Sequence, residues 1–235
     1  MDTSSTPQPA AKPYQRIAAP LHLILVLALL GILIYSGRIR SVQMRSAVNP
    51  DHVNFYLRTI LTEWFVLAVV LLGVWLSGSS LLTVLGERWR SVQQMLLDLG
   101  IGVAFLIVSI MMVATIGPLI GARQDNREIQ YLLPHGSREI VLWVCLSISA
   151  GICEEAVYRG YLQRQFMALT RNATLGILLS AAVFGLAHSY QGFQRAAVIT
   201  IGAAMGGVLA HWRKTVRPGM FAHTFQDLLG LIAKH

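Results

Sequence analysis

The chain alternates between long apolar runs and short polar segments. Predominantly apolar runs cover about residues 17–35, 60–76, 96–116, 140–152, 174–188 and 196–212. A helix needs about 20 such residues to cross a hydrocarbon core of about 30 Å. Their Leu, Val, Ile and Ala residues follow one another without the alternation that a membrane-spanning β-strand shows over about 10 residues. The pattern therefore predicts an all-α fold, a polytopic transmembrane helical bundle of about seven or eight helices.

Polar and turn-forming segments divide the chain into three parts. Residues 1–16 are polar, small and rich in proline, and we expect them to form a disordered tail. Residues 17–136 are expected to hold the N-terminal membrane helices, with an amphipathic segment over 81–95 that lies at the membrane interface. Residues 137–235 are expected to form a catalytic helical domain, whose first helix begins near Ser137 and continues past Arg159.

Composition and charge agree with a membrane protein. Of the 235 residues, 54% are hydrophobic and 13% are charged, whereas a soluble domain has about 25% charged residues. The net charge is +8, and the arginines lie mostly between apolar runs, where they contact lipid head groups. Because basic residues form no stripe with interleaved aromatic residues, nucleic acid is not an expected partner. We expect a multi-pass integral membrane protein whose main partner is membrane lipid.

Two adjacent carboxylates and an arginine follow the apolar run over residues 140–152. They are Glu154, Glu155 and Arg159. Ionisable groups in an apolar helix are costly and usually mark function. On a helix, Glu155 and Arg159 lie one turn apart and can pair, whereas Glu154 points about 100° away from Glu155. This spacing predicts that Glu155 has a structural role and that Glu154 stays available for chemistry.

Further polar groups recur on the later apolar helices. His188 ends one apolar run, and His223 shares a helix face with Asp227. Taken singly, each favours a structural role, such as a core histidine or a hydrogen-bonded pair. Taken together with Glu154, they favour a site inside the bundle, because an apolar bundle cannot leave such groups facing lipid.

Two kinds of hydrolytic chemistry fit this set. A carboxylate in a dry site can take a proton from water, and imidazoles can stabilise the oxyanion that forms on an attacked carbonyl. Alternatively, Glu154, His188, His223 and Asp227 can ligate a divalent metal, with zinc as the best match, whose open position carries the water. The zincin pattern His-Glu-x-x-His is absent, and the residues alone do not decide between the two versions.

The motifs resemble those of a known family. In order, they are Glu154-Glu155-x-x-x-Arg159, Phe184-x-x-x-His188 and His223-x-x-x-Asp227. This series resembles that of the CPBP family, which comprises CAAX prenyl endopeptidases and bacteriocin-processing (ABI) membrane proteins. The resemblance covers about residue 137 to the C-terminus. It implies an intramembrane endopeptidase with a helical-bundle fold, braced by the Glu155–Arg159 pair.

The resemblance also implies roles for the remaining residues. Glu154 would activate the water, and His188 would assist as its partner. His223 and Asp227 would stabilise the oxyanion or hold the water. The last motif of the family often ends in Asn, whose amide can donate to an oxyanion, whereas an ionised Asp227 cannot. Asp227 would therefore be protonated, or act as an acceptor or a metal ligand, which favours the metal alternative slightly.

These observations lead to a ranked set of functions. The first is hydrolysis of a peptide bond in a membrane-associated protein or peptide, for example a prenylated one, in a bacterial inner membrane. The alternative is a non-catalytic membrane protein of the same fold that acts in bacteriocin immunity or as a scaffold. A transporter or proton relay ranks last, because the chain shows no paired repeats with broken helices.

Overall fold

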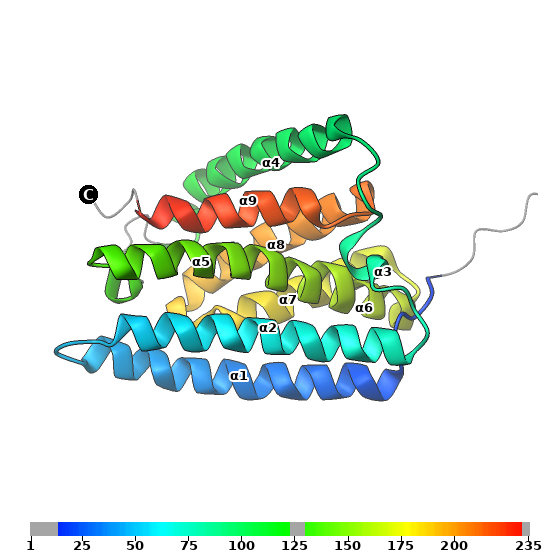
Figure 1. Cartoon of the computed structure of the whole chain (residues 1–235). Coiled ribbons are helices and arrows are strands. Elements are labelled where there is room, and N and C mark those ends of the chain that lie inside the picture. Colours follow the sequence, from blue (N-terminus) through cyan, green and yellow to red (C-terminus); the bar gives the residue numbers. More distant parts are fainter. Residues whose placement is uncertain (1–13, 123–129, 232–235) are drawn as a thin grey trace, which may run out of the picture.

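The computed structural model describes residues 14–122 and 130–231, so most of the expected disordered tail (residues 1–13) lies outside the described residues. Within the described ranges all regular structure is helical (Figure 1). The longer elements are α1 (Pro20–Ser46), α2 (His52–Leu76), α4 (Val92–Leu119), α5 (Ser137–Glu154), α7 (Ala173–Ala187), α8 (Phe193–Arg213) and α9 (Arg217–Leu228). The shorter ones are α3 (Leu82–Leu85), η2 (Gln130–Leu132), η3 (Glu155–Leu162), α6 (Gln163–Thr170), η4 (Ser189–Gln191) and η5 (Leu229–Leu231).

Five helical segments within the described residues are long and apolar enough to cross a membrane. They are α1, α2, α4, the continuous segment Ser137–Thr170, and α8. Their outward faces carry large exposed apolar side chains, such as Leu21 on α1 and Phe193 on α8. Such side chains suit contact with lipid. The chain is thus a multi-pass membrane protein, and the predicted all-α helical bundle is confirmed.

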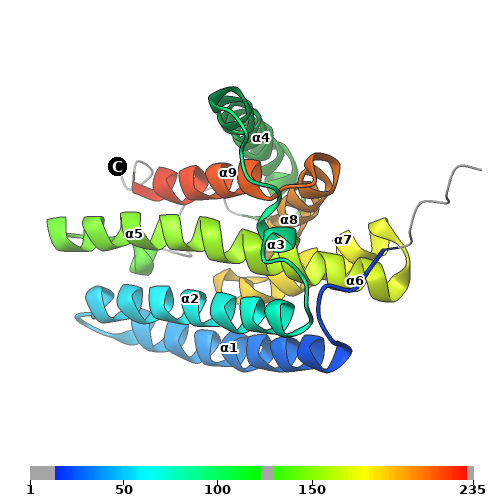
Figure 2. The ribbon, with the colours of Figure 1, turned by 45° about the vertical axis from the view of Figure 1, so that its right-hand side comes forward.

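The helix α5 runs through the middle of the bundle. It packs against α2 on one side and against α9 on the other, and α4 covers the far side of α9. The hairpin of α1 and α2 forms one edge of the bundle in both views, and α4 forms the opposite edge (Figure 2). The pair α7 and α8 packs together behind this layer. Side chains at the C-terminal end of α5 are therefore enclosed by other helices.

The helix that begins at Ser137 changes its winding where the two glutamates lie. It is α-helical to Glu154, forms the π-helix η3 over the next eight residues, and returns to α-helix in α6. It thus continues past Arg159 as predicted, although the π-helix was not predicted. All the side chains of η3 are buried, and a π-helical turn frequently marks a functional site.

Two N-terminal features differ from the sequence-based expectation. The segment over 81–95 does not form one amphipathic helix: the short α3 ends before Gly86, which has a left-handed φ of 91°, and residues 92–95 are the first turn of α4. The apolar run over about 96–116 lies within the longer α4, which begins at Val92 and continues past Pro118 to Leu119. A proline in the last turn removes a single hydrogen bond, which a long apolar helix tolerates.

Candidate active site

The imidazole of His223, on α9, lies between the two adjacent glutamates of the central helix. Its Nδ1 atom is 3.2 Å from Glu155 Oε1, and its Nε2 atom is 3.6 Å from Glu154 Oε2. The same Nε2 atom is 3.8 Å from Oδ2 of Asp227, one turn further along α9. The structure thus brings together acids and an imidazole that are about 70 residues apart in the sequence, as the convergence argument requires.

Glycines allow α5 and α9 to approach closely enough for these contacts. A methyl group at Gly151 on α5 would collide with Thr224 on α9, and one at Gly219 on α9 would collide with the carboxylate of Glu155. Small residues at such positions let helix backbones pack closely in a membrane protein. The glycines therefore set the distance between His223 and the two glutamates.

Glu155 is held on two sides. Nη1 of Arg159 is 3.0 Å from Glu155 Oε1, and both side chains are buried. The guanidinium of Arg159 also stacks on the ring of Phe184, with Cζ 4.4 Å from the ring centroid. Glu155 therefore carries a buried charge that Arg159 and His223 balance. The pair is placed to brace the site, as its spacing suggested, and Glu154 remains on a different side of the helix.

His188 borders the same cluster from the end of α7. Its Nδ1 atom is 3.0 Å from the backbone oxygen of Phe184. Because a carbonyl oxygen only accepts, Nδ1 carries the hydrogen and Nε2 is the acceptor nitrogen. The ring of Phe184 lies 4.5 Å from that of His188 and 6.0 Å from that of His223. His188 is also close enough to Asp227 for the two side chains to interact electrostatically.

Part of the chain matches a known family. Residues 136–229 match the family model described as Type II CAAX prenyl endopeptidase Rce1-like. We call residues 136–229 the CAAX protease segment, after this match. The CAAX protease segment runs from the start of α5 to the end of α9 and contains every site residue predicted from the sequence. No curated protein and no solved structure matches the chain.

A further acid reaches the site from outside the CAAX protease segment. Glu63 lies on the α2 face that also carries Tyr56 and Val70, seven residues away on either side and both fully buried. The charges of Glu154 and Asp227 act on it. Oε2 of Glu63 and Oε2 of Glu154 are both buried without a hydrogen-bond partner among the described residues. Sequence analysis missed Glu63, although it is the only acid in the run over 60–76.

Tyr190, in η4, is a second residue that the sequence analysis missed. Its ring stacks with that of His188 at 6.1 Å between centroids, and its hydroxyl accepts a hydrogen bond of 3.0 Å from Gln191. Burial of the phenol, together with the nearby carboxylates of Glu154 and Asp227, raises the pKa of Tyr190 above its ordinary value. Tyr190 is therefore a neutral hydrogen-bond donor at neutral pH, beside the acids of the CAAX protease segment.

The arrangement does not fit a metal centre. No group of three or more His, Cys, Asp or Glu side chains within the described residues is placed to hold a metal ion. Instead, the imidazole of His223 contacts these acids directly: Nδ1 is 3.2 Å from Glu155 Oε1, and Nε2 is 3.6 Å from Glu154 Oε2 and 3.8 Å from Asp227 Oδ2. We therefore derive no step through zinc.

Proposed function

We propose that the protein is an intramembrane endopeptidase that uses Glu154 to activate water. It would hydrolyse a peptide bond in a membrane-associated protein or peptide. One observation carries the proposal: a buried Glu154 oxygen, without a hydrogen-bond partner among the described residues, lies 3.6 Å from the imidazole of His223. A carboxylate and an imidazole in such a setting can act on one water molecule. The match of residues 136–229 to the family model supports the same reaction.

The proposed reaction begins with the attacking water. Glu154 takes a proton from it, and the oxygen attacks the carbonyl carbon of the scissile bond, which gives a tetrahedral intermediate with a negative oxygen. His188 assists by accepting a hydrogen bond from the water at Nε2, the nitrogen that its contact with Phe184 leaves as acceptor. Glu154 is thus the general base and His188 orients the water. General-base catalysis contributes about 10²–10⁴-fold to the rate.

Hydrogen-bond donors would stabilise the negative oxygen. His223 is the first, because its Nε2 atom faces the same space as the Glu154 oxygen. Tyr190 is the second, as a neutral phenol close to the acids. Asp227 replaces the Asn that the family motif often has. Since its Oδ2 atom lies 3.8 Å from His223 Nε2, we assign Asp227 the role of orienting the imidazole rather than binding the oxyanion directly.

The leaving amine needs a proton when the tetrahedral intermediate collapses. Glu154 can return the proton it took from the water, and the C–N bond then breaks to give an amine and a carboxylic acid. Glu63, on α2, has a buried carboxylate oxygen without a hydrogen-bond partner among the described residues and is close enough to Glu154 and Asp227 to interact with them electrostatically. A second carboxylate so placed can hold or relay a proton beside Glu154. We therefore include Glu63 in the proposed catalytic set.

Replacing Glu63 by Gln is expected to lower the cleavage rate at least tenfold while leaving the fold intact. A buried carboxylate oxygen without a partner costs free energy, so a neutral side chain of the same shape should not destabilise the protein. The measurements are kcat for a peptide probe and the unfolding temperature of the purified protein. A wild-type rate in Glu63→Gln would remove this residue from the mechanism. A parallel loss of rate and stability would assign it a structural role.

A lipid-linked peptide is the substrate class that we propose. The matching family model is described by a prenyl endopeptidase activity. A protein with at least five candidate membrane helices in its described part lies among molecules that partition into lipid. Location in a bacterial inner membrane is part of the proposal.

The test is a cleavage assay on the purified full chain in lipid nanodiscs. The probe is a synthetic peptide with a farnesylated CAAX terminus, and the control is the same peptide without the farnesyl group. We expect the farnesylated peptide to be cut at one bond, identified by product mass, and the control to be cut at least tenfold more slowly. Equal rates would contradict the lipid-linked substrate class. No product from either peptide would favour the non-catalytic alternative.

A further inference from the structure

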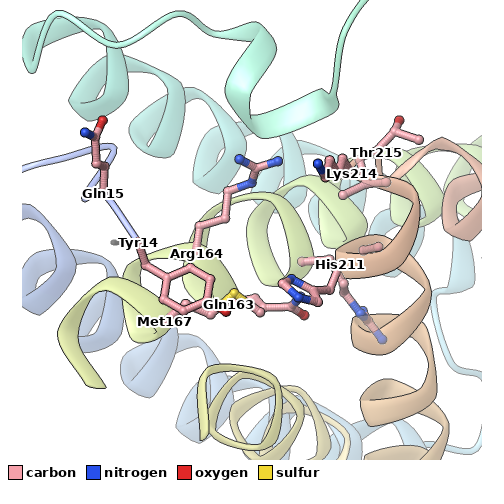
Figure 3. A pocket seen from close by; sticks show the side chains of 11 residues that line it. Tyr14, Gln15, Gln163, Arg164, Met167, His211, Lys214 and Thr215 are labelled. Atoms are coloured by element: carbon pink, nitrogen blue, oxygen red, sulfur yellow. The ribbon is translucent and has the colours of Figure 1, made fainter. Parts of the chain in front are cut away.

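A cavity of about 220 Å³ lies beside the brace residues, away from His223. The N-terminal segment, α6, the end of α8 and the turn before α9 enclose it (Figure 3). Its walls are formed by Tyr14, Gln15, Arg159, Gln163, Arg164, Met167, Ala210, His211, Lys214, Thr215 and Val216. The cavity has room for about seven water molecules at about 30 Å³ each, which is enough for a small polyatomic ion.

The lining of this cavity is basic. Arg159, Arg164 and Lys214 line it together with His211, and no acidic side chain does. Arg159 is neutralised by Glu155. The guanidinium of Arg164 has no hydrogen-bond or ion-pair partner among the residues that the structure describes, and it is only partly exposed. A guanidinium withdrawn from water without a partner favours the binding of an anion.

Arg164 and Lys214 come from different elements, and both line the cavity. Arg164 extends from α6 toward the side on which Lys214 and Thr215 lie (Figure 3). Lys214 follows the last residue of α8 and has a left-handed φ of 56°. At the opposite wall the ring of Tyr14 lies 6.4 Å from that of His211. An anion in the cavity would contact the planar guanidinium of Arg164 and the ammonium group of Lys214.

The position of the cavity along the bundle indicates which kind of anion it binds. It lies at the end of α8, a helix long and apolar enough to cross the membrane. Trp212, next to the cavity residue His211, is 67% exposed. Exposed tryptophans beside basic residues at a helix end mark the head-group level of a membrane. The abundant anion at that level is the phosphate group of a lipid.

We propose that this cavity is a phosphate-binding site that takes the head-group phosphate of an anionic lipid. Arg164 binds two phosphate oxygens, and Lys214 supplies the second positive charge. Because Arg159 also lines the cavity, the bound phosphate lies next to the π-helix η3 and stabilises the segment that carries the glutamates. This proposal does not depend on the proposed peptidase activity.

The test measures lipid binding to the purified full chain by native mass spectrometry and by the shift in unfolding temperature. The probes are phosphatidylglycerol, phosphatidylcholine and inorganic phosphate. The test variant is Arg164→Gln with Lys214→Gln. The matched control is Arg38→Gln with Arg58→Gln, which removes the same charge from exposed positions outside the cavity. We expect the test variant to bind phosphatidylglycerol at least tenfold more weakly than wild type, and the control to bind it as wild type does.

The outcomes separate the sources of phosphate. If phosphatidylglycerol stabilises the wild type and inorganic phosphate at millimolar concentration does not, the cavity is a lipid site. Equal stabilisation by both would show a site for free phosphate. Wild-type binding of phosphatidylglycerol in the test variant would overturn the proposal. If the double variant does not fold, Lys214→Gln alone, at an exposed position, is expected to weaken binding at least threefold, and unchanged binding would overturn the proposal equally.

Discussion

Replacing Glu154 by Gln is expected to lower kcat/KM for the farnesylated peptide by about 10²–10⁴-fold, the usual contribution of a general base. Gln has the shape of Glu but cannot take a proton from water. The Oε2 atom of Glu154 has no hydrogen-bond partner among the described residues, so the substitution breaks no such bond. The unfolding temperature should therefore stay close to that of the wild type. The measurements are the initial cleavage rate in nanodiscs and the thermal unfolding curve of the same preparation.

The matched control for this variant is Glu87→Gln. Glu87 forms an ion pair with Arg90, and its side chain is 83% exposed, so its loss should change neither activity nor stability. Full cleavage activity in Glu154→Gln would defeat the glutamate mechanism, even if the fold and the family match stand. An inactive Glu154→Gln that keeps the biological effect of the wild type would instead support the non-catalytic alternative.

The sequence revealed the helical bundle and most of the acid and imidazole groups for one reason. Ionisable residues are rare in apolar helices, so Glu154, His188 and His223 are conspicuous there. Their motifs then carried the resemblance to a family, which the match over residues 136–229 supports. The spacing of Glu155 and Arg159 also predicted their contact, because residues four apart on a helix are neighbours.

Other parts of the site depend on contacts between distant segments. Glu63 is as conspicuous in its apolar run as Glu154 is, but only the packing of α2 against α5 shows that it is near enough to Glu154 to interact with it electrostatically. The π-helix η3 depends on how its buried side chains pack, because a methyl group at Gly160 would collide with the backbone of Val84. Tyr190 carries no charge and lies in a short turn, so nothing in the sequence predicted that its hydroxyl lies near the acids.

The choice between a metal and direct proton transfer also needed the structure. The sequence places Glu154, His188, His223 and Asp227 on three helices, and either chemistry fits that arrangement. The structure adds the orientation of one ring. The imidazole of His223 points its two nitrogens at carboxylates on different sides, so the acids contact the imidazole directly. Spacing within a sequence does not determine such an orientation.

Replacing Arg159 by Met is expected to destabilise the protein by about 3–5 kcal/mol, the usual cost of removing one partner of a buried ion pair. The substitution removes the 3.0 Å contact with Glu155 and leaves that carboxylate buried with His223 alone. It also removes the stacking of the guanidinium on Phe184, which adds to the loss. The measurement is the free energy of unfolding in mixed micelles with a denaturant, compared with the wild type.

A double-mutant cycle separates the charge from the packing. In Glu155→Gln with Arg159→Met, no buried carboxylate is left without its partner, so we expect the double variant to be more stable than Arg159→Met alone. Arg159→Lys keeps the charge but loses the planar contact with Phe184, and we expect it to fall between the wild type and Arg159→Met. If Arg159→Met were as stable as the wild type, the ion pair would not brace the helix. A defect in cleavage without a defect in stability would then assign Arg159 a role in positioning Glu155 and His223.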